Sequence, residues 1–586
     1  MPTRSPQRPK ARPLAPRARP GLPSPIPMIR PIPIGIDDFR KLREQGMAYV
    51  DKSHLIREVL DKGAEVLLLP RPRRFGKTLN MTMLRCFFEK GAEDLSPLFA
   101  DLSIWQAGDA YRAHFQRYPV IFLSLKSIQL QTFEPTWQMI QKRLSGLFEE
   151  QRALLDGGVL SDDEAQRYRQ ILDGTAEFSV CADALLDLST YLHRAHGEKV
   201  VILLDEYDAP IHAGVVGGYA PRILDFFRAF FSAGLKGNPH LFKAVLTGIL
   251  RIAKESIFSG LNNLAVYTLL RPDFSTCFGF TEPEVMAFLE RAGRSDRLRA
   301  VRAWYNGYDF GGTVIYNPWS ILNYIDSPEP EPRPYWVSTS ANELVREALV
   351  KHAAKAHEDI EALLEGGGVL RRLDENVVLT DLDTRADTLF GLLTFSGYLK
   401  AEKRVLDPDD EPYYLLSIPN REVRGVYTST FREWMEGRMG GESAVERLKR
   451  ALLSGDTEAL EEELGAFTQN VLSYHDTARR PEQVYHAFVI GLLATLEPEY
   501  EVRSNRESGK GRPDVIIRPK QAGKPGAVLE LKVAKPGKKT LDQALAEGVA
   551  QIQERDYASE LRAAGASPVY AFAVAFDGKE ARVVGV

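Results

Sequence analysis

The stretch EVLLLPRPRRFGKT, from Glu65 to Thr78, decides the fold of the N-terminal half of the chain. Its apolar run EVLLLP is short and uninterrupted, as in a buried strand, and the residues from Thr78 to Lys90 have the pattern of a helix. A phosphate-binding loop needs an abrupt strand end, exposed backbone N–H groups and a helix N-terminus that faces the anion. The segment from Arg71 to Thr78 lies where such a loop belongs.

Two residues at the end of this segment carry specific expectations. Lys77 would reach the β- and γ-phosphates of a nucleotide, and the Thr78 hydroxyl would bind Mg²⁺. The segment departs from the pattern GxxxxGK[ST], because Arg71 stands at the first glycine and Pro72 stiffens the turn. We expect these loop residues to contact the nucleotide: Arg73, Arg74, Phe75, Gly76, Lys77 and Thr78.

A second apolar run ends in two acids. KVVILL, from Lys199 to Leu204, precedes Asp205 and Glu206, and open α/β sheets bind ligands at the carboxyl ends of their strands. Asp205 would hold Mg²⁺, and Glu206 would orient or deprotonate the attacking water. Solvated acids at an exposed strand end are the alternative. GKT after one strand and an acid pair after another favour a site for ATP and Mg²⁺.

Further strands extend this pattern. PVIFLSL, residues 119–125, and LFKAVL, residues 241–246, alternate with helical stretches, which predicts a mostly parallel sheet of P-loop NTPase type covered on both faces. Thr247 ends the last strand and could sense a γ-phosphate, while Arg251 could act as an arginine finger within or between subunits. A helix N-cap and a surface charge are the equally open alternative for these two residues.

Composition narrows the class of protein. The chain has 586 residues, 26% of them charged, with a formal net charge of -4, which fits a soluble protein of several domains. No apolar run approaches the length that spans a membrane. The three cysteines, Cys86, Cys181 and Cys277, form no CxxC pair, and the histidines form no HxxxH or HExxH pair. This spacing argues against a disulfide framework or a zinc cluster and favours a cytoplasmic location.

Four regions follow from these patterns. Residues 1–27 are basic, rich in proline and free of acids, so we expect a disordered tail. Residues 28–280 form the nucleotide-binding domain, residues 281–475 a mainly helical middle section, and residues 476–586 a last α/β domain. The middle section is rich in aromatic residues. We assign these to its core and turns rather than to a base-stacking platform.

The last domain contains a candidate metal site. Asp514 opens the strand DVIIR, and a turn leads to the strand AVLELKV, which carries Glu530 and Lys532. Residues two apart on a strand share a face, so Glu530 and Lys532 point the same way, and a hairpin can bring Asp514 beside them. Two carboxylates and a cation suit metal-dependent cleavage of a phosphodiester. Solvated residues on an antiparallel sheet are the alternative.

Several long phrases resemble the bacterial AAA-ATPase-like family, whose members typically carry a C-terminal PD-(D/E)XK nuclease-superfamily domain. The phrases are PIGIDDFRKL, AYVDKS, LLLPRPRRFGKT, LLDEYDAP and TGILRIAKESIFSGLNNL, with WYNGYDFGG and YNPWSILNYI in the middle section. The resemblance implies that PRRFGK[ST] is the family's own form of the phosphate loop. It also suggests that Tyr49 and Asp51 lie near the nucleotide.

The resemblance also implies roles in a C-terminal PD-(D/E)XK-like α/β domain. Asp514 and Glu530 would bind the metal, and Lys532 would position or activate the water. Glu482 fits the acid that the first helix of the superfamily contributes to the metal. Gln551 and Tyr557 resemble the superfamily's QxxxxxY element. A degenerate domain that binds DNA without cutting it is the alternative.

Charge supports a nucleic-acid surface in this domain. Residues 503–540 contain eleven basic and three acidic residues, an excess that phosphate contacts would use, although a solvated hairpin tip would look similar. We therefore expect an ATPase coupled to a Mg²⁺-dependent deoxyribonuclease, with DNA, or alternatively RNA, as its partner and a homo-oligomer as an open option. The alternative function is a nucleotide-switched regulator that binds DNA or protein and has an inactive nuclease-like domain.

Overall fold

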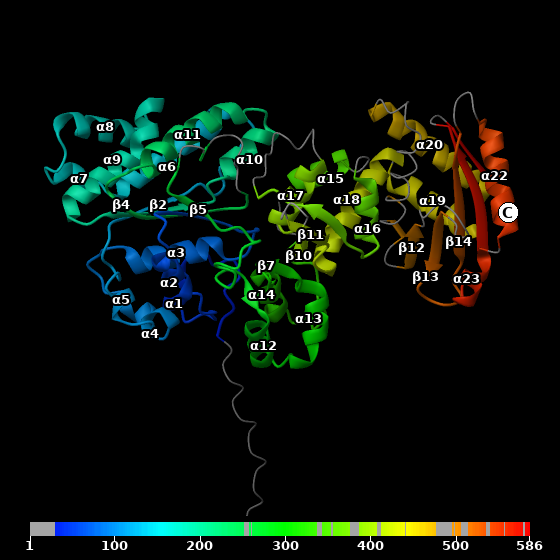
Figure 1. Ribbon diagram of the computed structural model, residues 1–586, viewed down its shortest axis with the longest axis horizontal. Helices are drawn as coiled ribbons and strands as arrows, with labels where there is room; N and C mark the ends of the chain where they lie inside the picture. The colour runs from blue at the N-terminus through cyan, green and yellow to red at the C-terminus, as the bar shows by residue number, and fades with distance from the viewer. Residues whose placement is uncertain are drawn as a thin grey trace, which may run out of the picture.

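The computed structural model in Figure 1 describes most of the chain. The described residues are 30–250, 257–258, 261–336, 343–352, 356–375, 386–406, 412–439, 441–475, 491, 495–496, 499–504, 514–534, 539–555, 557–577 and 580–586. The predicted tail at residues 1–27, Arg251 and Glu482 lie outside the described residues.

A five-stranded parallel sheet forms the centre of the N-terminal half, in the order β2-β3-β4-β1-β5. Its strands are β1 (Val66–Pro70), β2 (Val120–Ser124), β3 (Val200–Asp205), β4 (Leu241–Gly248) and β5 (Leu264–Val266). Every residue of β1 and β3 is buried, because helices cover both faces of the sheet. The predicted strands and their parallel arrangement are thus confirmed.

Figure 1 shows the two helical layers of this half. One layer lies with the phosphate-loop helix and contains α1 (Phe39–Glu44), α2 (His54–Asp61), α3 (Lys77–Phe88), α4 (Ser103–Gln106) and α5 (Asp109–Arg112). The other contains α6 (Phe133–Glu150), α7 (Ala153–Asp156), α8 (Asp162–Leu172), α9 (Phe178–His196), α10 (Ala209–Val216) and α11 (Ala220–Leu235). The carboxyl ends of the strands remain available to a ligand at the edge between these layers.

The middle section contains more β-structure than the sequence indicated. Its helices are α12 (Glu282–Arg291), α13 (Leu298–Tyr305), α14 (Pro318–Asp326), α15 (Glu343–His352), α16 (His357–Leu364), α17 (Ala386–Phe395) and α18 (Arg421–Met439). One small sheet has the order β6-β8-β7, from β6 (Phe280–Thr281), β7 (Tyr308–Phe310) and β8 (Thr313–Tyr316). A second has the order β10-β11-β9, from β9 (Val369–Arg372), β10 (Lys400–Leu406) and β11 (Pro412–Ser417). The sequence predicted a small β element near Tyr413 to Ile418, which is β11, whereas β6, β7, β8 and β9 have four residues or fewer and are too short for their periodicity to stand out.

The aromatic residues of the middle section form much of its core. Tyr305 and Tyr308 are buried, and Phe75 of the phosphate loop packs edge-on against Tyr308 at a centroid distance of 5.0 Å. One continuous set of buried apolar side chains extends from Phe39 to Phe431. The middle section therefore shares part of its core with the parallel sheet, through residues such as Tyr308, while Tyr305 belongs to a separate cluster formed mainly by residues 280–325.

The C-terminal sheet has the order β12-β13-β14-β15-β16 and is mixed, since only β14 and β15 pair in parallel. Its strands are β12 (Tyr500–Ser504), β13 (Val515–Pro519), β14 (Gly526–Val533), β15 (Val569–Phe576) and β16 (Ala581–Gly585). It packs with α19 (Glu442–Ser454), α20 (Thr457–His475), α22 (Leu541–Glu554) and α23 (Ala558–Ala563). The core of this domain thus includes α19 and α20, which precede the predicted boundary at residue 476.

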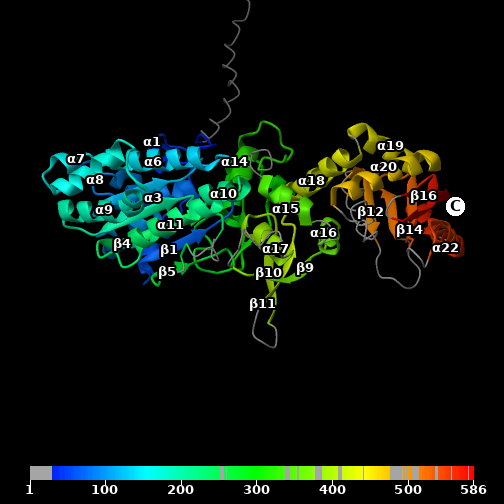
Figure 2. The same cartoon turned by 90° about the horizontal axis from the view of Figure 1, so that it is seen from above.

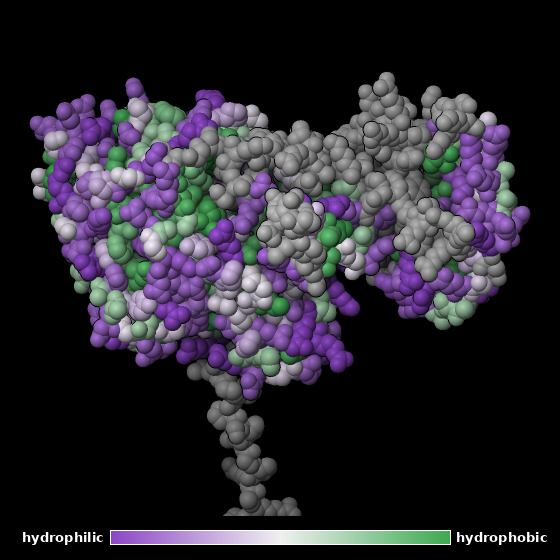
Figure 3. Space-filling view, viewed as in Figure 1, coloured by the Kyte–Doolittle hydropathy of each residue, from purple (hydrophilic) through white to green (hydrophobic). Residues whose placement is uncertain are grey.

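The two sheets lie far apart along the molecule. Figures 1 and 2 agree in placing the C-terminal sheet at the opposite end of the long axis from the parallel sheet, with α18 between them. On the face in Figure 3, hydrophilic residues cover much of the described surface. Among the described helices, none combines the length and apolar character needed to cross a bilayer.

Candidate functional site

The loop after β1 turns sharply before α3 begins. Arg71 N donates to Gly248 O at 2.9 Å, which ties the loop to the end of β4. Arg74 (φ 67°) and Gly76 (φ 83°) both take left-handed backbone conformations, and Gly76 does so without a steric penalty. The turn brings Lys77 to the first position of α3, where backbone N–H groups are free to bind an anion.

Lys77 is buried at the start of α3, with its ammonium group directed back into the loop. Its Nζ donates to the carbonyl oxygens of Arg71 at 3.1 Å and Pro72 at 3.0 Å. Burial lowers the pKa of Lys77, while the charges of Glu206, Asp208 and Asp205 oppose that shift. The N–H groups that Lys77 donates to these loop carbonyls could equally be donated to phosphate oxygens. Lys77 therefore fits the phosphate-binding role predicted for it.

Asp205 is fully buried and joins three elements at the carboxyl edge of the sheet. Thr78 Oγ1 donates to Asp205 Oδ2 at 2.9 Å, and Thr247 Oγ1 donates to Asp205 Oδ1 at 2.9 Å. Thr247 reaches this carboxylate because β4 lies beside β3 in the sheet. A hydroxyl and a carboxylate in contact are hard oxygen ligands of the kind that Mg²⁺ prefers.

Glu206 follows Asp205 in a left-handed conformation, with φ 50°. Burial raises the pKa of Glu206 and the charge of Asp205 raises it further, while Lys77 lowers it. The side chain lines the same cavity as Lys77 and Thr78. A carboxylate with a raised pKa beside a phosphate site can accept a proton from water.

The cavity at this edge has a volume of about 370 Å³. Its lining includes charged and polar side chains, among them Arg73, Lys77, Thr78, Glu206, Asp208 and His212. It also includes apolar side chains, among them Ile36, Leu79, Phe280, Phe288, Leu322 and Trp336. A pocket lined by both charged and apolar side chains suits a ligand with phosphates and a flat base.

The two residues suggested by resemblance alone have different positions. Tyr49 lines the cavity, and burial keeps its pKa well above the usual range. Asp51 instead accepts hydrogen bonds from the backbone N–H groups of Ser53 at 2.8 Å and Ser103 at 2.7 Å. Asp51 therefore holds the start of α2 in place.

Arg71, at the position of the missing glycine, is fully buried. Its guanidinium donates to the carbonyl oxygens of Pro70 at 2.8 Å, Tyr267 at 2.7 Å and Phe274 at 3.2 Å. The side chain thus points away from the cavity and joins β1 to the segment that precedes β6. Arg71 stabilises the loop through these three hydrogen bonds. An arginine at the position of the usual glycine therefore does not block the cavity.

The sequence did not single out several residues that line the cavity. Asp208 Oδ2 accepts from the backbone N–H groups of Ile249 at 2.7 Å and Leu250 at 3.0 Å, which fixes the turn after β4. The Arg74 guanidinium lies 4.2 Å from the ring centroid of Trp319 on α14. Trp319 and Trp336 line the cavity as well. The aromatic cluster expected only as core therefore also contributes part of the wall.

The second candidate site lies on β13 and β14. Asp514 Oδ2 accepts from the backbone N–H of Leu531 at 2.7 Å, which places Asp514 beside Glu530. Lys532 Nζ donates to Glu530 Oε1 at 2.6 Å and to Gln551 Oε1 at 2.8 Å. Gln551 Nε2 in turn donates to Tyr557 Oη at 3.2 Å. Hydrogen bonds thus join four side chains in one chain, and the backbone of Leu531 holds Asp514 beside it; the four are Glu530, Lys532, Gln551 and Tyr557.

Glu530 has the features of a metal ligand. Its side chain is fully buried, and Oε2 has no hydrogen-bond partner among the described residues. Burial and the charge of Asp514 raise its pKa, while Lys532 lowers it. A buried carboxylate oxygen without a partner is costly unless a cation binds it, so the residues fit a divalent metal.

Two predicted site residues lie outside the described residues. Arg251 follows the described turn at Ile249 and Leu250, and Glu482 belongs to residues 476–490. Their roles as an arginine finger and as a third metal ligand remain predictions.

The geometry combines a parallel sheet of P-loop type with a C-terminal mixed sheet that is consistent with the PD-(D/E)XK type. Comparison with known families agrees: residues 33–258 match the family described as Predicted AAA-ATPase, and residues 480–585 match the PD-(D/E)XK nuclease superfamily. The chain thus contains an AAA-ATPase-like domain and a C-terminal PD-(D/E)XK nuclease-superfamily domain.

A similar protein of Azotobacter chroococcum mcd 1 is described as an uncharacterized protein in the vnfD 5' region. The two sequences are 27% identical over 563 residues, which cover 94% of this chain and 98% of the relative. The similarity therefore includes the middle section as well as the two domains.

Proposed function

We propose that the N-terminal domain binds and hydrolyses ATP with Mg²⁺. The contact between Thr78 and Asp205 carries the proposal, because it places a hydroxyl and a carboxylate from separate elements where one ion can bind both. The 370 Å³ cavity beside them has charged side chains for phosphates and apolar side chains for a base.

Each residue of the site has a distinct role in this proposal. Lys77 would exchange its bonds to loop carbonyls for bonds to phosphate oxygens. Glu206 would orient the attacking water and accept its proton, for which its raised pKa suits it. Bound Mg²⁺ would neutralise charge that develops on the phosphates. Thr247 would sense the terminal phosphate through Asp205, because the hydroxyls of Thr247 and Thr78 both donate to this carboxylate.

ATP binding to the Lys77→Ala variant tests the first half of this proposal. We expect its affinity for ATP to fall at least about tenfold, because a buried ammonium–phosphate contact is lost. Lys236→Ala is a matched control, since Lys236 is exposed and distant in sequence. Equal ATP affinity in wild type and Lys77→Ala would contradict the assignment of the phosphate loop.

We also propose that the C-terminal domain cleaves DNA with a divalent metal. Asp514 and Glu530 would hold the ion, and Lys532 would position the attacking water. The unpartnered Glu530 Oε2 supports this assignment. The eleven basic residues within residues 503–540 support a phosphate-rich partner.

Cleavage of plasmid and single-stranded DNA with Mg²⁺ or Mn²⁺ tests this second site. Glu530→Gln keeps the shape of the side chain and should abolish cutting, while Glu554→Gln, at an exposed position of α22, should not affect it. Cutting that survives Glu530→Gln would remove the metal assignment. If wild type binds DNA without metal-dependent cutting, the regulator with an inactive nuclease-like domain is the better description.

Coupling of the two domains is the last part of the proposal. The two sheets lie at opposite ends of the molecule in Figures 1 and 2, so coupling would act through α18 and the helices packed on it. We expect DNA to change the ATPase rate and ATP to change the rate of DNA cleavage. Rates that are independent in both directions would show two uncoupled activities in one chain.

A further inference from the structure

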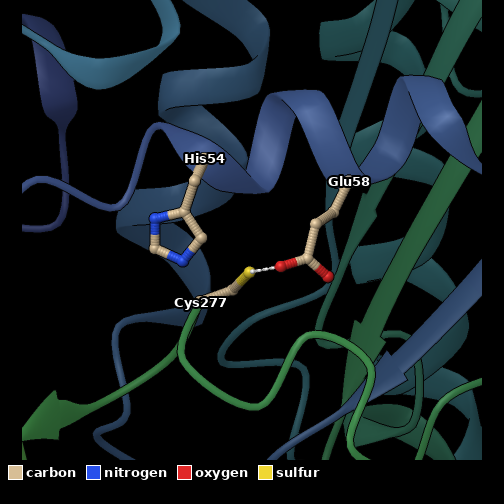
Figure 4. A group of neighbouring side chains, drawn as sticks. All are labelled: His54, Glu58 and Cys277. Carbon is tan, nitrogen blue, oxygen red and sulfur yellow. Dashed lines mark hydrogen bonds between the residues drawn. The ribbon is translucent and has the colours of Figure 1, made fainter. Parts of the chain in front are cut away.

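Three side chains with metal-binding chemistry meet behind the phosphate loop. Figure 4 shows His54 and Glu58 on α2 facing Cys277, which lies on the segment that leads to β6. One ligand atom from each of the three lies within 4.8 Å of the others. Cys277 Sγ donates to Glu58 Oε1 at 3.4 Å. The spacing of cysteines and histidines indicated no such site, because the fold joins residues 219 positions apart.

Helix geometry and loop contacts fix this arrangement. His54 and Glu58 are one turn apart on α2, so their side chains share a face of the helix. The loop is held against that face at two further points. Glu58 Oε2 accepts from the backbone N–H of Phe274 at 2.9 Å, and His54 Nε2 lies 3.2 Å from Thr276 Oγ1. These contacts hold α2 and the loop together before any ion binds.

A thiol, an imidazole and a carboxylate are the donor set of a zinc-type site with one open position. Ligand distances around tetrahedral zinc imply ligand-to-ligand separations of roughly 3.3 to 3.8 Å. The 3.4 Å separation of Cys277 Sγ and Glu58 Oε1 already satisfies this requirement. The three ligand atoms lie within 4.8 Å of one another, so the His54 imidazole would move closer to the other two ligands to complete the set.

Burial holds the pKa of the Cys277 thiol well above its usual range, so this thiol can bind a metal only by losing its proton. Arg71 and Lys52 act to lower the pKa of the Cys277 thiol, although burial and the charge of Glu58 raise it well above its usual range. Without a metal the thiol therefore stays protonated, and its S–H group donates a hydrogen bond to Glu58 Oε1. Binding of a divalent cation would form the metal–sulfur bond, break the S–H bond and release that proton to solvent.

We propose that His54, Glu58 and Cys277 bind a thiophilic divalent cation of the zinc class, which fastens α2 to the loop beneath the nucleotide site. This ion would be distinct from the Mg²⁺ bound by Thr78 and Asp205. The softer sulfur and nitrogen donors separate the two sites by metal preference, since Mg²⁺ selects oxygen ligands.

The fastened loop makes direct contacts to the phosphate loop and its helix. Cys277 O accepts from Asn80 Nδ2 at 2.8 Å, and Gly279 N donates to Phe75 O at 3.2 Å. Phe274 O accepts from the buried guanidinium of Arg71 at 3.2 Å. Cys277 itself lines the cavity, so a metal bound there would stabilise this part of the wall, with a structural role.

Cobalt(II) is a suitable probe because a cysteine thiolate bound to Co²⁺ gives a charge-transfer absorption band. Metal-stripped full-length protein titrated with Co²⁺ should develop this band with one equivalent bound, and Zn²⁺ should displace it. Cys277→Ser should abolish the band, and His54→Gln should weaken Co²⁺ affinity at least about tenfold. Cys181→Ser is the matched control, because Cys181 is also a buried free cysteine.

The outcomes separate the proposal from its alternatives. A band that persists in Cys277→Ser, or disappears in Cys181→Ser, would overturn the assignment. Absence of a band in wild-type protein that still binds ATP would show that the three residues form only a hydrogen-bonded cluster. Circular dichroism of each variant distinguishes loss of a ligand from loss of the fold. The readout is independent of ATPase and nuclease rates, so failure of the proposed function would leave this test intact.

Discussion

The Thr78 hydroxyl and the Asp205 carboxylate are in contact at 2.9 Å, although β4 lies between the strands from which they come. Thr78 reaches across because it lies in the first turn of α3, which follows the loop after β1 and packs against β3. Asp205 is thereby shared between Thr78 and Thr247. This contact joins the two predicted ligands of the Mg²⁺ ion, the Thr78 hydroxyl and the Asp205 carboxylate, in one site.

Removal of the Thr78 hydroxyl should weaken binding of ATP with Mg²⁺. Thr78→Val keeps the branched shape but removes the oxygen, so we expect at least about a tenfold loss of Mg²⁺-dependent ATP affinity. Thr78→Ser restores a hydroxyl and should bind nearly as well as wild type. Isothermal titration with and without Mg²⁺ measures both variants. A Thr78→Val protein with unchanged Mg²⁺ dependence would exclude Thr78 as a ligand.

Glu206 should control turnover rather than binding. Glu206→Gln keeps the size of the side chain but cannot accept a proton, so ATP should still bind while hydrolysis falls by about 10²- to 10⁴-fold. The raised pKa of Glu206 means that the carboxylate becomes protonated at a higher pH than usual. The wild-type rate should therefore fall with decreasing pH before an ordinary glutamate would titrate. A rate constant near that of wild type in Glu206→Gln would assign proton transfer elsewhere.

The strand ends and their side chains could be predicted because buried parallel strands are read as short apolar runs. Asp205 stands at the end of one such run, and Lys77 follows another after the loop from Arg71 to Gly76, so topology places both at one edge of the sheet. The role of Arg71 was not predictable from its position, since its three carbonyl partners include Tyr267 and Phe274, which are far away in sequence. The sequence pattern around Arg71 does not indicate contacts with residues so far along the chain.

The composite wall of the cavity was missed for a related reason. Trp319 and Trp336 belong to an aromatic-rich section, and an aromatic residue in a core looks the same in sequence as one that lines a pocket. Their place depends on how the middle section packs on the parallel sheet. The joining of His54 to Cys277 likewise depends on tertiary packing. Sequence patterns therefore predicted the phosphate-binding part of the site better than its apolar part.

Gln551 should act by positioning Lys532. Its carboxamide accepts from Lys532 Nζ at 2.8 Å and donates to Tyr557 Oη at 3.2 Å, so Gln551→Leu removes the support on one side of the ammonium group. We expect about 10- to 100-fold slower DNA cleavage, with metal affinity at Asp514 and Glu530 largely retained. Gln551→Glu keeps an acceptor and should restore part of the rate. Equal loss in both variants would indicate a general packing defect.

Glu422, in the first turn of α18, should make the stability of the middle section depend on pH. The side chain is 1% exposed and accepts from Trp336 N at 2.6 Å and Ser320 Oγ at 2.7 Å. Burial raises the pKa of Glu422 to about 7, despite these two donors. In the unfolded chain the pKa returns to about 4.5. Between these values the folded protein holds a proton that the unfolded protein has released.

The contribution of Glu422 to the free energy of unfolding should therefore be fully present below pH 4.5 and should be lost as the pH rises toward 7. The difference of 2.5 pKa units corresponds to roughly 3 kcal/mol at most. Glu422→Gln cannot ionise and keeps most of the hydrogen-bonding shape, so its midpoint of thermal unfolding should vary less over this window than that of wild type. Glu433→Gln on the exposed side of α18 is the control. Parallel pH profiles for wild type and Glu422→Gln would show that the carboxyl group does not titrate in this range. In that case an ionised Glu422 would accept the hydrogen bond from Trp336 N, and Trp336 lines the cavity that also contains Lys77.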